Sequence, residues 1–205
     1  MEFITYINLG IVFSALGSIL PSFLNLTVVK YSLEYNRKSA FYLIFGFCLV
    51  LFFQANIGAY LTSILFKNSE YIDIIKRVGV AILLILSLNF FRLYFTVSIP
   101  KERKVVANSK AFYQGMWMSL INTFAIPFYF IVLSFLAGLG HFKYTFVNGF
   151  YFSAGAILGS LFVYSTYAII ASKIENSLSY IATKMNLILG CLTGAIGIGN
   201  LISLV

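Results

Sequence analysis

Six long apolar runs occupy most of the chain and limit what it can fold into. They extend over residues 4–29, 40–66, 78–97, 112–139, 145–171 and 185–205, and none of them contains an acidic residue. A helix needs about 20 apolar residues to cross the hydrocarbon core of a bilayer. Continuous apolar runs in lipid satisfy their backbone polar groups only as helices. The sequence therefore predicts an all-α integral membrane protein with six transmembrane helices.

The composition excludes several other classes of protein. Apolar residues make up 60% of the chain and charged residues 10%, whereas an average soluble domain is about 25% charged. The two cysteines, Cys48 and Cys191, lie inside apolar runs, and His141 is the single histidine. This is too few for a disulfide framework or a multi-histidine metal centre. We therefore expect no metal, no cofactor and no enzymatic activity.

The basic residues indicate how the chain is oriented in the membrane. Its net charge is +8, but the lysines and arginines lie in short gaps between the runs, which is typical of membrane orientation rather than of nucleic-acid binding. The gaps on one side hold ten of them: Lys30, Arg37, Lys38, Arg92, Lys101, Arg103, Lys104, Lys110, Lys173 and Lys184. The other side holds Lys67, Lys76, Arg77 and Lys143. The first side is predicted to be cytoplasmic, with both termini outside.

The two halves of the chain resemble each other. Matching positions recur at similar offsets and in the same order: Pro21 with Pro127, Gly46 with Gly149, and Gly79 with Gly190. We expect one transmembrane domain over residues 1–205, with repeat one at 1–97, a cytoplasmic basic loop at 98–111 and repeat two at 112–205. Since three spans is an odd number, the second repeat enters the membrane inverted, as in many secondary transporters.

Pro21 and Pro127 fall near the middle of their runs. Proline removes a helical hydrogen bond and kinks the helix, so each is predicted to begin a half-helix whose N-terminal amide groups carry partial positive charge. Two such ends meeting at mid-membrane would hold a carboxylate. The alternative interpretation is a pair of structural kinks in packed helices.

Polar residues within the apolar runs are the candidate site residues, because an unsatisfied amide in lipid is costly. For any single amide, hydrogen bonding between helices is the alternative role. We assign substrate binding and translocation to Pro21, Ser22, Asn25, Gln54, Asn56, Asn122, Thr123 and Pro127. Secondary polar or helix-packing roles are assigned to Asn89, Asn200 and Tyr164. All six acidic residues lie in loops or at helix ends, which disfavours a proton relay or a site for hard cations.

Three stretches resemble the LysE-type amino-acid exporter family: residues 17–22, residues 79–92, and residues 115–122 with the sequence Gly-Met-Trp-Met-Ser-Leu-Ile-Asn. The family carries Pro-Gly-Pro in its first helix and Asn-Pro in its fourth. Here a single Pro21 stands in the first motif and Thr123 follows Asn122 in the second. The acidic residue that the family has in its second helix is missing from residues 46–59.

The resemblance implies export of amino acids or related small metabolites across a bacterial inner membrane, driven by an ion gradient. Its expected partners are an amino-acid-like solute and the lipid bilayer, with a homodimer left open. Two alternatives remain. One is a non-transporting membrane binding or sensor subunit with the same fold. The other is a membrane thiol carrier of electrons that uses Cys48 and Cys191.

Overall fold

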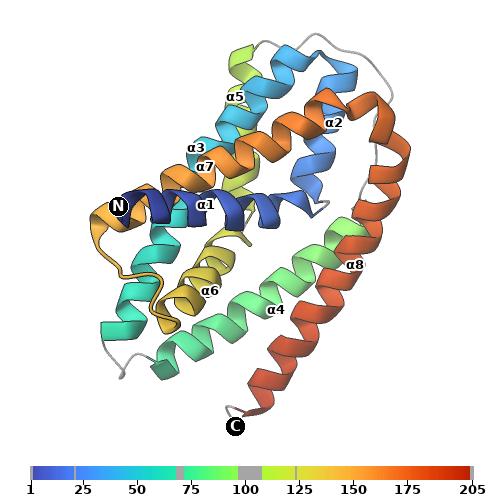
Figure 1. Cartoon of the computed structure of the whole chain (residues 1–205). Coiled ribbons are helices and arrows are strands. Elements are labelled where there is room, and N and C mark those ends of the chain that lie inside the picture. Colours follow the sequence, from blue (N-terminus) through green and yellow to red (C-terminus); the bar gives the residue numbers. More distant parts are fainter. Residues whose placement is uncertain (1, 21, 68–71, 97–107, 123, 204–205) are drawn as a thin grey trace.

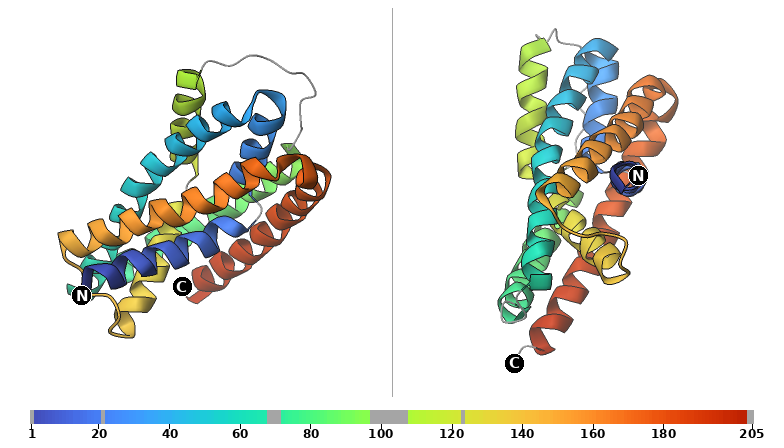
Figure 2. Two further views of the ribbon diagram at one scale, coloured as in Figure 1. Left: turned by 45° about the horizontal axis from the view of Figure 1, so that its top comes forward. Right: turned by 60° about the vertical axis from the view of Figure 1, so that its left-hand side comes forward.

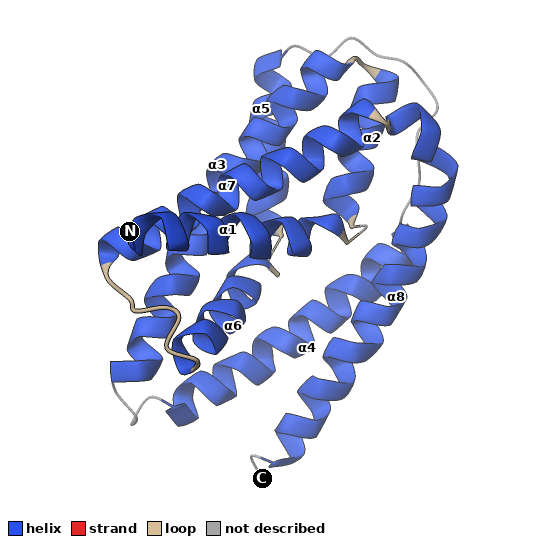
Figure 3. Ribbon diagram, viewed as in Figure 1, coloured by secondary structure: helices blue, strands red, loops and turns tan. Residues whose placement is uncertain are grey.

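The computed structural model describes residues 2–20, 22–67, 72–96, 108–122 and 124–203, and within these ranges the chain forms helices and no strand (Figures 1 and 3). The helices are α1 (Glu2–Ile19), α2 (Phe23–Glu34), α3 (Arg37–Lys67), α4 (Ile72–Thr96), α5 (Asn108–Ile121), α6 (Ala125–Gly138), α7 (Phe146–Ile169) and α8 (Ala171–Ser203). The predicted all-α fold is confirmed.

Helix length and apolarity identify the candidate membrane spans among the described residues. Arg37–Leu65 of α3 and Phe146–Ile169 of α7 are each long and apolar enough to cross a bilayer. The pairs α1–α2 and α5–α6 pass the same test together, and they bend by 77° and 61° at their breaks. This gives two spans, or four if each bent pair is one span. The other two predicted runs lie in α4 and α8, so the number six stays a prediction.

Four of the five predicted gaps between spans contain helical residues, and the two longest gaps show this best. Residues 172–184 belong to α8, and α5 begins at Asn108, inside the predicted loop 98–111. The 172–184 segment contains neither glycine nor proline, so nothing in it ends a helix, and charged residues such as lysine and glutamate favour one. An apolar run predicts the part of a helix that lies in lipid, and the helix can extend beyond the ends of that run.

The helices pack as a six-helix body with a two-helix pair beside it. In the body, α1 lies along α7 and α3 lies along α5, while α3 also contacts α6 and α7. The pair is α4 and α8, which contact each other over much of their length, and α8 also touches α2 (Figures 1 and 2). The α2–α3 turn and the α7–α8 junction lie at one end of the molecule, opposite the N-terminus and the α6–α7 connection (Figure 1).

Five glycines bring helices of the body into backbone contact. Gly10, Gly155 and Gly159 lie at the crossing of α1 with α7, and Gly46 and Gly115 lie at the crossing of α3 with α5. A methyl group on any of the five would collide with a backbone carbonyl oxygen of the facing helix. Small residues are the usual means of close helix approach in membranes, where apolar side chains gain little by leaving lipid. These two crossings therefore fix α1 against α7 and α3 against α5.

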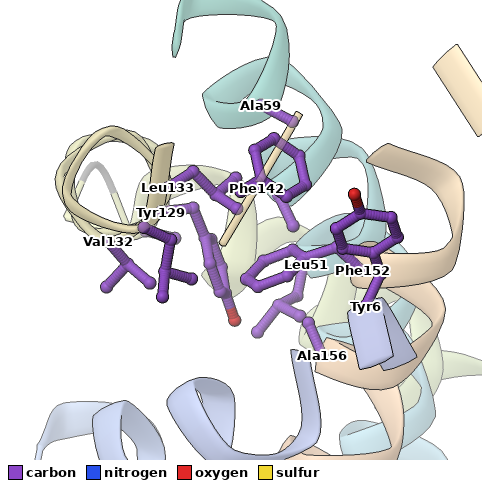
Figure 4. Packing of buried hydrophobic residues seen from close by; sticks show 12 residues of the cluster. Tyr6, Leu51, Ala59, Tyr129, Val132, Leu133, Phe142, Phe152 and Ala156 are labelled. Carbon is purple, nitrogen blue, oxygen red and sulfur yellow. The ribbon is translucent and has the colours of Figure 1, made fainter. Parts of the chain in front are cut away.

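Two clusters of buried apolar residues fill the body. We call the first the α6 cluster, and it combines α1, α3, α6 and α7 (Figure 4): Tyr6, Leu51, Ala55, Ala59, Ala125, Tyr129, Val132, Leu133, Leu136, Phe142, Phe152 and Ala156. We call the second the α2 cluster, and it combines α2, α3, α5 and α7: Leu24, Val28, Tyr31, Ala40, Leu43, Ile44, Phe47, Cys48, Ala111, Tyr164 and Ala168. Each cluster thus contains one half-helix that follows a break.

Candidate functional site

The first helix break is held together by the side chain of Asn25. Its Nδ2 donates to the carbonyl oxygen of Ser18 at 2.8 Å, in the last turn of α1. Its Oδ1 accepts from the backbone N–H of Ser22 at 3.1 Å and from the Ser22 hydroxyl at 2.5 Å. Asn25 is fully buried, so these bonds tie the end of α1 to the start of α2. Pro21 itself lies outside the described residues.

The second break is held in the same way by Gln54 of α3. Its Nε2 donates to the carbonyl oxygens of Ser119 at 2.9 Å and Asn122 at 3.4 Å, at the end of α5. The last carbonyls of a helix have no intrahelical donor, and buried polar groups need partners. Gln54 and Asn25 therefore serve the same purpose at the two breaks. Thr123 lies outside the described residues.

The predicted kink at Pro127 is wrong in its position. The helix is interrupted between Ile121 and Ala125, and Pro127 is the third residue of α6. The N–H groups in the first turn of a helix have no intrahelical acceptor, so a proline there costs little. Pro127 is compatible with the start of α6 and does not cause the break.

The remaining predicted residues do not gather at one place. Asn56 donates to the carbonyl oxygen of Phe52 in its own helix, at 2.9 Å. Asn89 is half-buried on α4, and the side chain of Asn200 lies outside the described residues. Tyr164 is buried in the α2 cluster, where its ring meets that of Phe47 edge-on with centroids 5.7 Å apart. The predicted set thus divides between the two breaks, α3, α4 and α7.

A buried hydrogen-bonded chain of four hydroxyl groups joins α1, α6 and α7, and we call it the hydroxyl network. Ser14 contacts the hydroxyl of Tyr129 at 2.8 Å and that of Ser160 at 2.6 Å. Ser160 also contacts Ser18 at 2.9 Å. All four side chains are buried. Figure 4 shows the Tyr129 hydroxyl directed from the α6 cluster toward α1.

These four residues are not among the predicted site residues, because a serine or tyrosine within an apolar run is a weak signal. One pattern points to two of them: Gly10, Ser14 and Ser18 recur every four residues. That spacing places them on one face of a helix and is typical of a close helix contact in a membrane. It predicts that a polar or small surface on another helix faces α1, but not which helix supplies it.

The hydroxyl network lies between the two apolar clusters. Tyr129 belongs to the α6 cluster, and Tyr164, whose hydroxyl lies near Ser18, belongs to the α2 cluster. Cys48 belongs to the same cluster as Tyr164. A hydroxyl can donate and accept hydrogen bonds without carrying a charge. The network is therefore suited to hydrogen bonding with a small polar solute. Its four members are serines and a tyrosine, and none of them is a carboxylate or an imidazole that could act in acid–base chemistry.

The two cysteines lie in different surroundings. Cys48 is buried in the α2 cluster, whereas Cys191 is exposed on α8, and both thiols are free. A dithiol carrier needs two thiols that can reach one another. This arrangement gives the electron-carrier alternative no support. Among the described residues, no group of three or more histidine, cysteine or acidic side chains is placed to hold a metal ion.

Two spanning helices, two bent helix pairs and a buried polar network define the chain as a helical membrane protein with interrupted helices. A family model described as LysE type translocator matches residues 15–203, and the chain belongs to this family. The match covers both breaks and three residues of the hydroxyl network, Ser18, Tyr129 and Ser160, while Ser14 lies just before it. It confirms the family resemblance seen in the sequence. No curated protein and no solved structure matches the chain.

Proposed function

We propose that the protein is a secondary transporter that exports amino acids or related small metabolites from a bacterial cytoplasm by alternating access. Membership of a translocator family supports the class. One structural observation carries the mechanism: the helix contacts are nearly unchanged when the first half of the chain is exchanged with the second.

The exchange replaces α1 and α2 by α5 and α6, α3 by α7, and α4 by α8. It converts the α1–α7 contact into the α3–α5 contact, and the α3–α6 contact into the α2–α7 contact. The α3–α7 and α4–α8 contacts map onto themselves. The contacts of α2 with α3 and α8 are the exceptions, since no equally extensive contacts of α6 correspond to them. This pattern supports two repeats, each of one broken and two continuous helices, inverted relative to each other.

The glycine crossings obey the same exchange. It relates Gly10 to Gly115 and Gly155 to Gly46, and all four make the same kind of contact with a facing carbonyl oxygen. A Cβ atom on Gly149, in contrast, would have no neighbour nearer than 3.5 Å, which is an ordinary contact. Gly155, rather than Gly149, is thus the structural counterpart of Gly46. The repeat is better recognised from these contacts than from the sequence offsets.

The two apolar clusters are also related by the exchange, and they suit the two gates of an alternating-access transporter. The α2 cluster is nearer the α2–α3 turn, where Arg37 and Lys38 lie, so the positive-inside tendency makes this the cytoplasmic gate. The α6 cluster is then the outer gate, and both termini face outward. With both clusters packed, the hydroxyl network is closed off from both sides, as in an occluded intermediate.

Efflux from proteoliposomes tests this proposal. The purified protein is reconstituted, the vesicles are loaded with a panel of labelled amino acids, and efflux is compared with that from protein-free vesicles. Ser160→Ala removes the central hydroxyl of the network and is expected to slow efflux at least tenfold. Ser63→Ala is the matched control, because Ser63 is also buried but bonds only to Tyr60 of its own helix. It is expected to leave efflux unchanged.

The outcome also separates the proposal from its alternative. Efflux of at least one solute, lost in Ser160→Ala and kept in Ser63→Ala, supports the exporter. Solute binding without efflux would instead indicate a non-transporting binding subunit. Intracellular metabolite profiles of cells with and without the protein identify the solute, because an exporter leaves its substrate depleted.

A further inference from the structure

Each half-helix that follows a break sends a tyrosine hydroxyl to the half-helix that precedes the other break. The Tyr31 hydroxyl of α2 donates to Oε1 of Gln114 on α5. The Tyr129 hydroxyl of α6 bonds to Ser14 of α1 at 2.8 Å. Exchanging the two halves of the chain relates the helices of one bond to those of the other, since α2 replaces α6 and α5 replaces α1. The bonded residues themselves are not at equivalent positions, because Ser14 follows Gly10 by four residues whereas Gln114 precedes Gly115 by one.

Both bonds lie where a gate would have to separate. Tyr31 belongs to the α2 cluster and Tyr129 to the α6 cluster, and the two side chains are 3% and 2% exposed. The partner Ser14 is also buried, whereas Gln114 is exposed, so the Tyr31–Gln114 bond is partly buried. Each bond joins the first half of the chain to the second. If the two halves rock apart at either cluster, the corresponding tyrosine loses its partner. A buried hydroxyl left without a partner is costly, so each bond opposes the opening of its own cluster.

We propose that the Tyr31–Gln114 and Ser14–Tyr129 bonds are two latches on corresponding helices of the two halves, the first holding the α2 cluster closed and the second the α6 cluster. The proposal rests on the proposed function, because it assigns the groups that control access to the site from each side. Breaking one latch biases the protein toward opening on that side only.

Cys48 provides a built-in reporter of access. It is 2% exposed and belongs to the α2 cluster. The chain has only two cysteines, so Cys191→Ser leaves Cys48 as the single thiol, and a membrane-impermeant maleimide modifies it only when the α2 cluster opens. Ala55 is fully buried in the α6 cluster, so Ala55→Cys in a chain without the two native cysteines reports in the same way on the α6 cluster.

The experiment measures the rate of maleimide modification of the full-length protein in these two single-thiol backgrounds, in inside-out and right-side-out vesicles. Tyr31→Phe is expected to raise the rate at Cys48 from the face with the α2–α3 turn, and Tyr129→Phe the rate in the Ala55→Cys background from the opposite face, each by roughly two- to tenfold for one lost hydrogen bond. Tyr35→Phe is the control for Tyr31, because the rings of Tyr31 and Tyr35 are neighbours at 4.7 Å. It is expected to leave the rate unchanged.

A second variant of each latch keeps the test decisive if a tyrosine variant misfolds. Gln114→Ala should reproduce the effect of Tyr31→Phe, and the two changes combined should have no larger effect than either alone. Ser14→Ala takes the same role for Tyr129. Unchanged rates in both pairs, or a rise from the same face for both, would overturn the proposal.

The latch and the exporter can fail separately. If the wild type shows efflux but the latch variants leave maleimide modification unchanged, the latch assignment is wrong and the exporter stands. If the variants shift modification to opposite faces while no solute shows efflux, the latches stand and the transport proposal is wrong.

Discussion

Gln54→Met tests whether the second helix break depends on an amide side chain. Methionine has nearly the same length and volume, so the change removes the hydrogen bonds and preserves the packing. Gln54 is 5% exposed, and its Nε2 bonds to the carbonyl oxygens of Ser119 and Asn122 at 2.9 and 3.4 Å. The first distance is that of a full hydrogen bond and the second is weak. We therefore count one lost hydrogen bond, since the Ser119 carbonyl oxygen also accepts from the backbone N–H of Asn122 at 3.1 Å and keeps that donor.

Leaving a buried acceptor unsatisfied costs about 1–3 kcal/mol, whereas measured hydrogen bonds between membrane helices average about 0.6 kcal/mol. Because the Ser119 carbonyl oxygen keeps the backbone N–H of Asn122 as a donor, we expect a value near the lower limit, about 0.6–1 kcal/mol. For a domain of this size, that corresponds to a fall of roughly 1–4 °C in Tm. The assay is thermal unfolding of the detergent-purified protein.

Asn56→Met is the matched control for Gln54→Met. Asn56 is on the same helix and its Nδ2 bonds to the carbonyl oxygen of Phe52, one turn back in α3. The Asn56 bond lies within α3, whereas the Gln54 bond joins α3 to the end of α5, so this change should alter Tm by less than the change at Gln54. Equal shifts in the two variants would show that the fall reflects loss of any amide, and the proposed brace at the second break would be refuted.

Three further predictions concern the breaks and the helix crossings. Asn25→Leu should lower Tm more than Gln54→Met, because Asn25 is fully buried and bonds on both sides of the first break; a smaller fall would contradict this. Gly155→Ala should reduce the yield of monodisperse protein in size-exclusion chromatography, whereas Gly149→Ala should not, since only the former places a methyl group against a backbone carbonyl. Pro127→Ala should change the free energy of unfolding by less than about 1 kcal/mol and leave efflux intact, because Pro127 lies in the first turn of α6.

The sequence predicts the class of fold well because the governing pattern is local. Each apolar run coincides with one helix or with one broken pair of helices, and the motif around Pro21 coincides with the end of α1. The second break was predicted at Pro127 but lies around Asn122, ahead of it. By propensity, proline was the stronger helix-breaking signal. In the first turn of a helix, however, a proline removes no intrahelical hydrogen bond, so its effect depends on where the helix begins.

The hydroxyl network could not be predicted in the same way. Its three bonds join residues 115, 146 and 142 positions apart, so no local window contains both partners. The face that carries Ser14 and Ser18 can be read from their spacing, but the partner depends on how α1 lies against α7. That placement follows from the contact of Gly10 with Gly155, which is itself a long-range feature.

The amide residues show why candidate site residues chosen for polarity alone are misassigned. A helix interrupted inside a membrane exposes carbonyl groups that neither water nor lipid can satisfy. The chain must supply donors for them before any solute arrives, and Asn25 and Gln54 do so. Such an amide has already used donor capacity on the backbone, and it can be released to a solute only by weakening the break. Hydroxyls linked in a chain differ, because each can rotate and exchange one hydroxyl partner for another group at little cost. A polar residue at a break therefore serves mainly to hold the interrupted backbone together. Recognition of the solute is then expected from the neighbouring hydroxyl network.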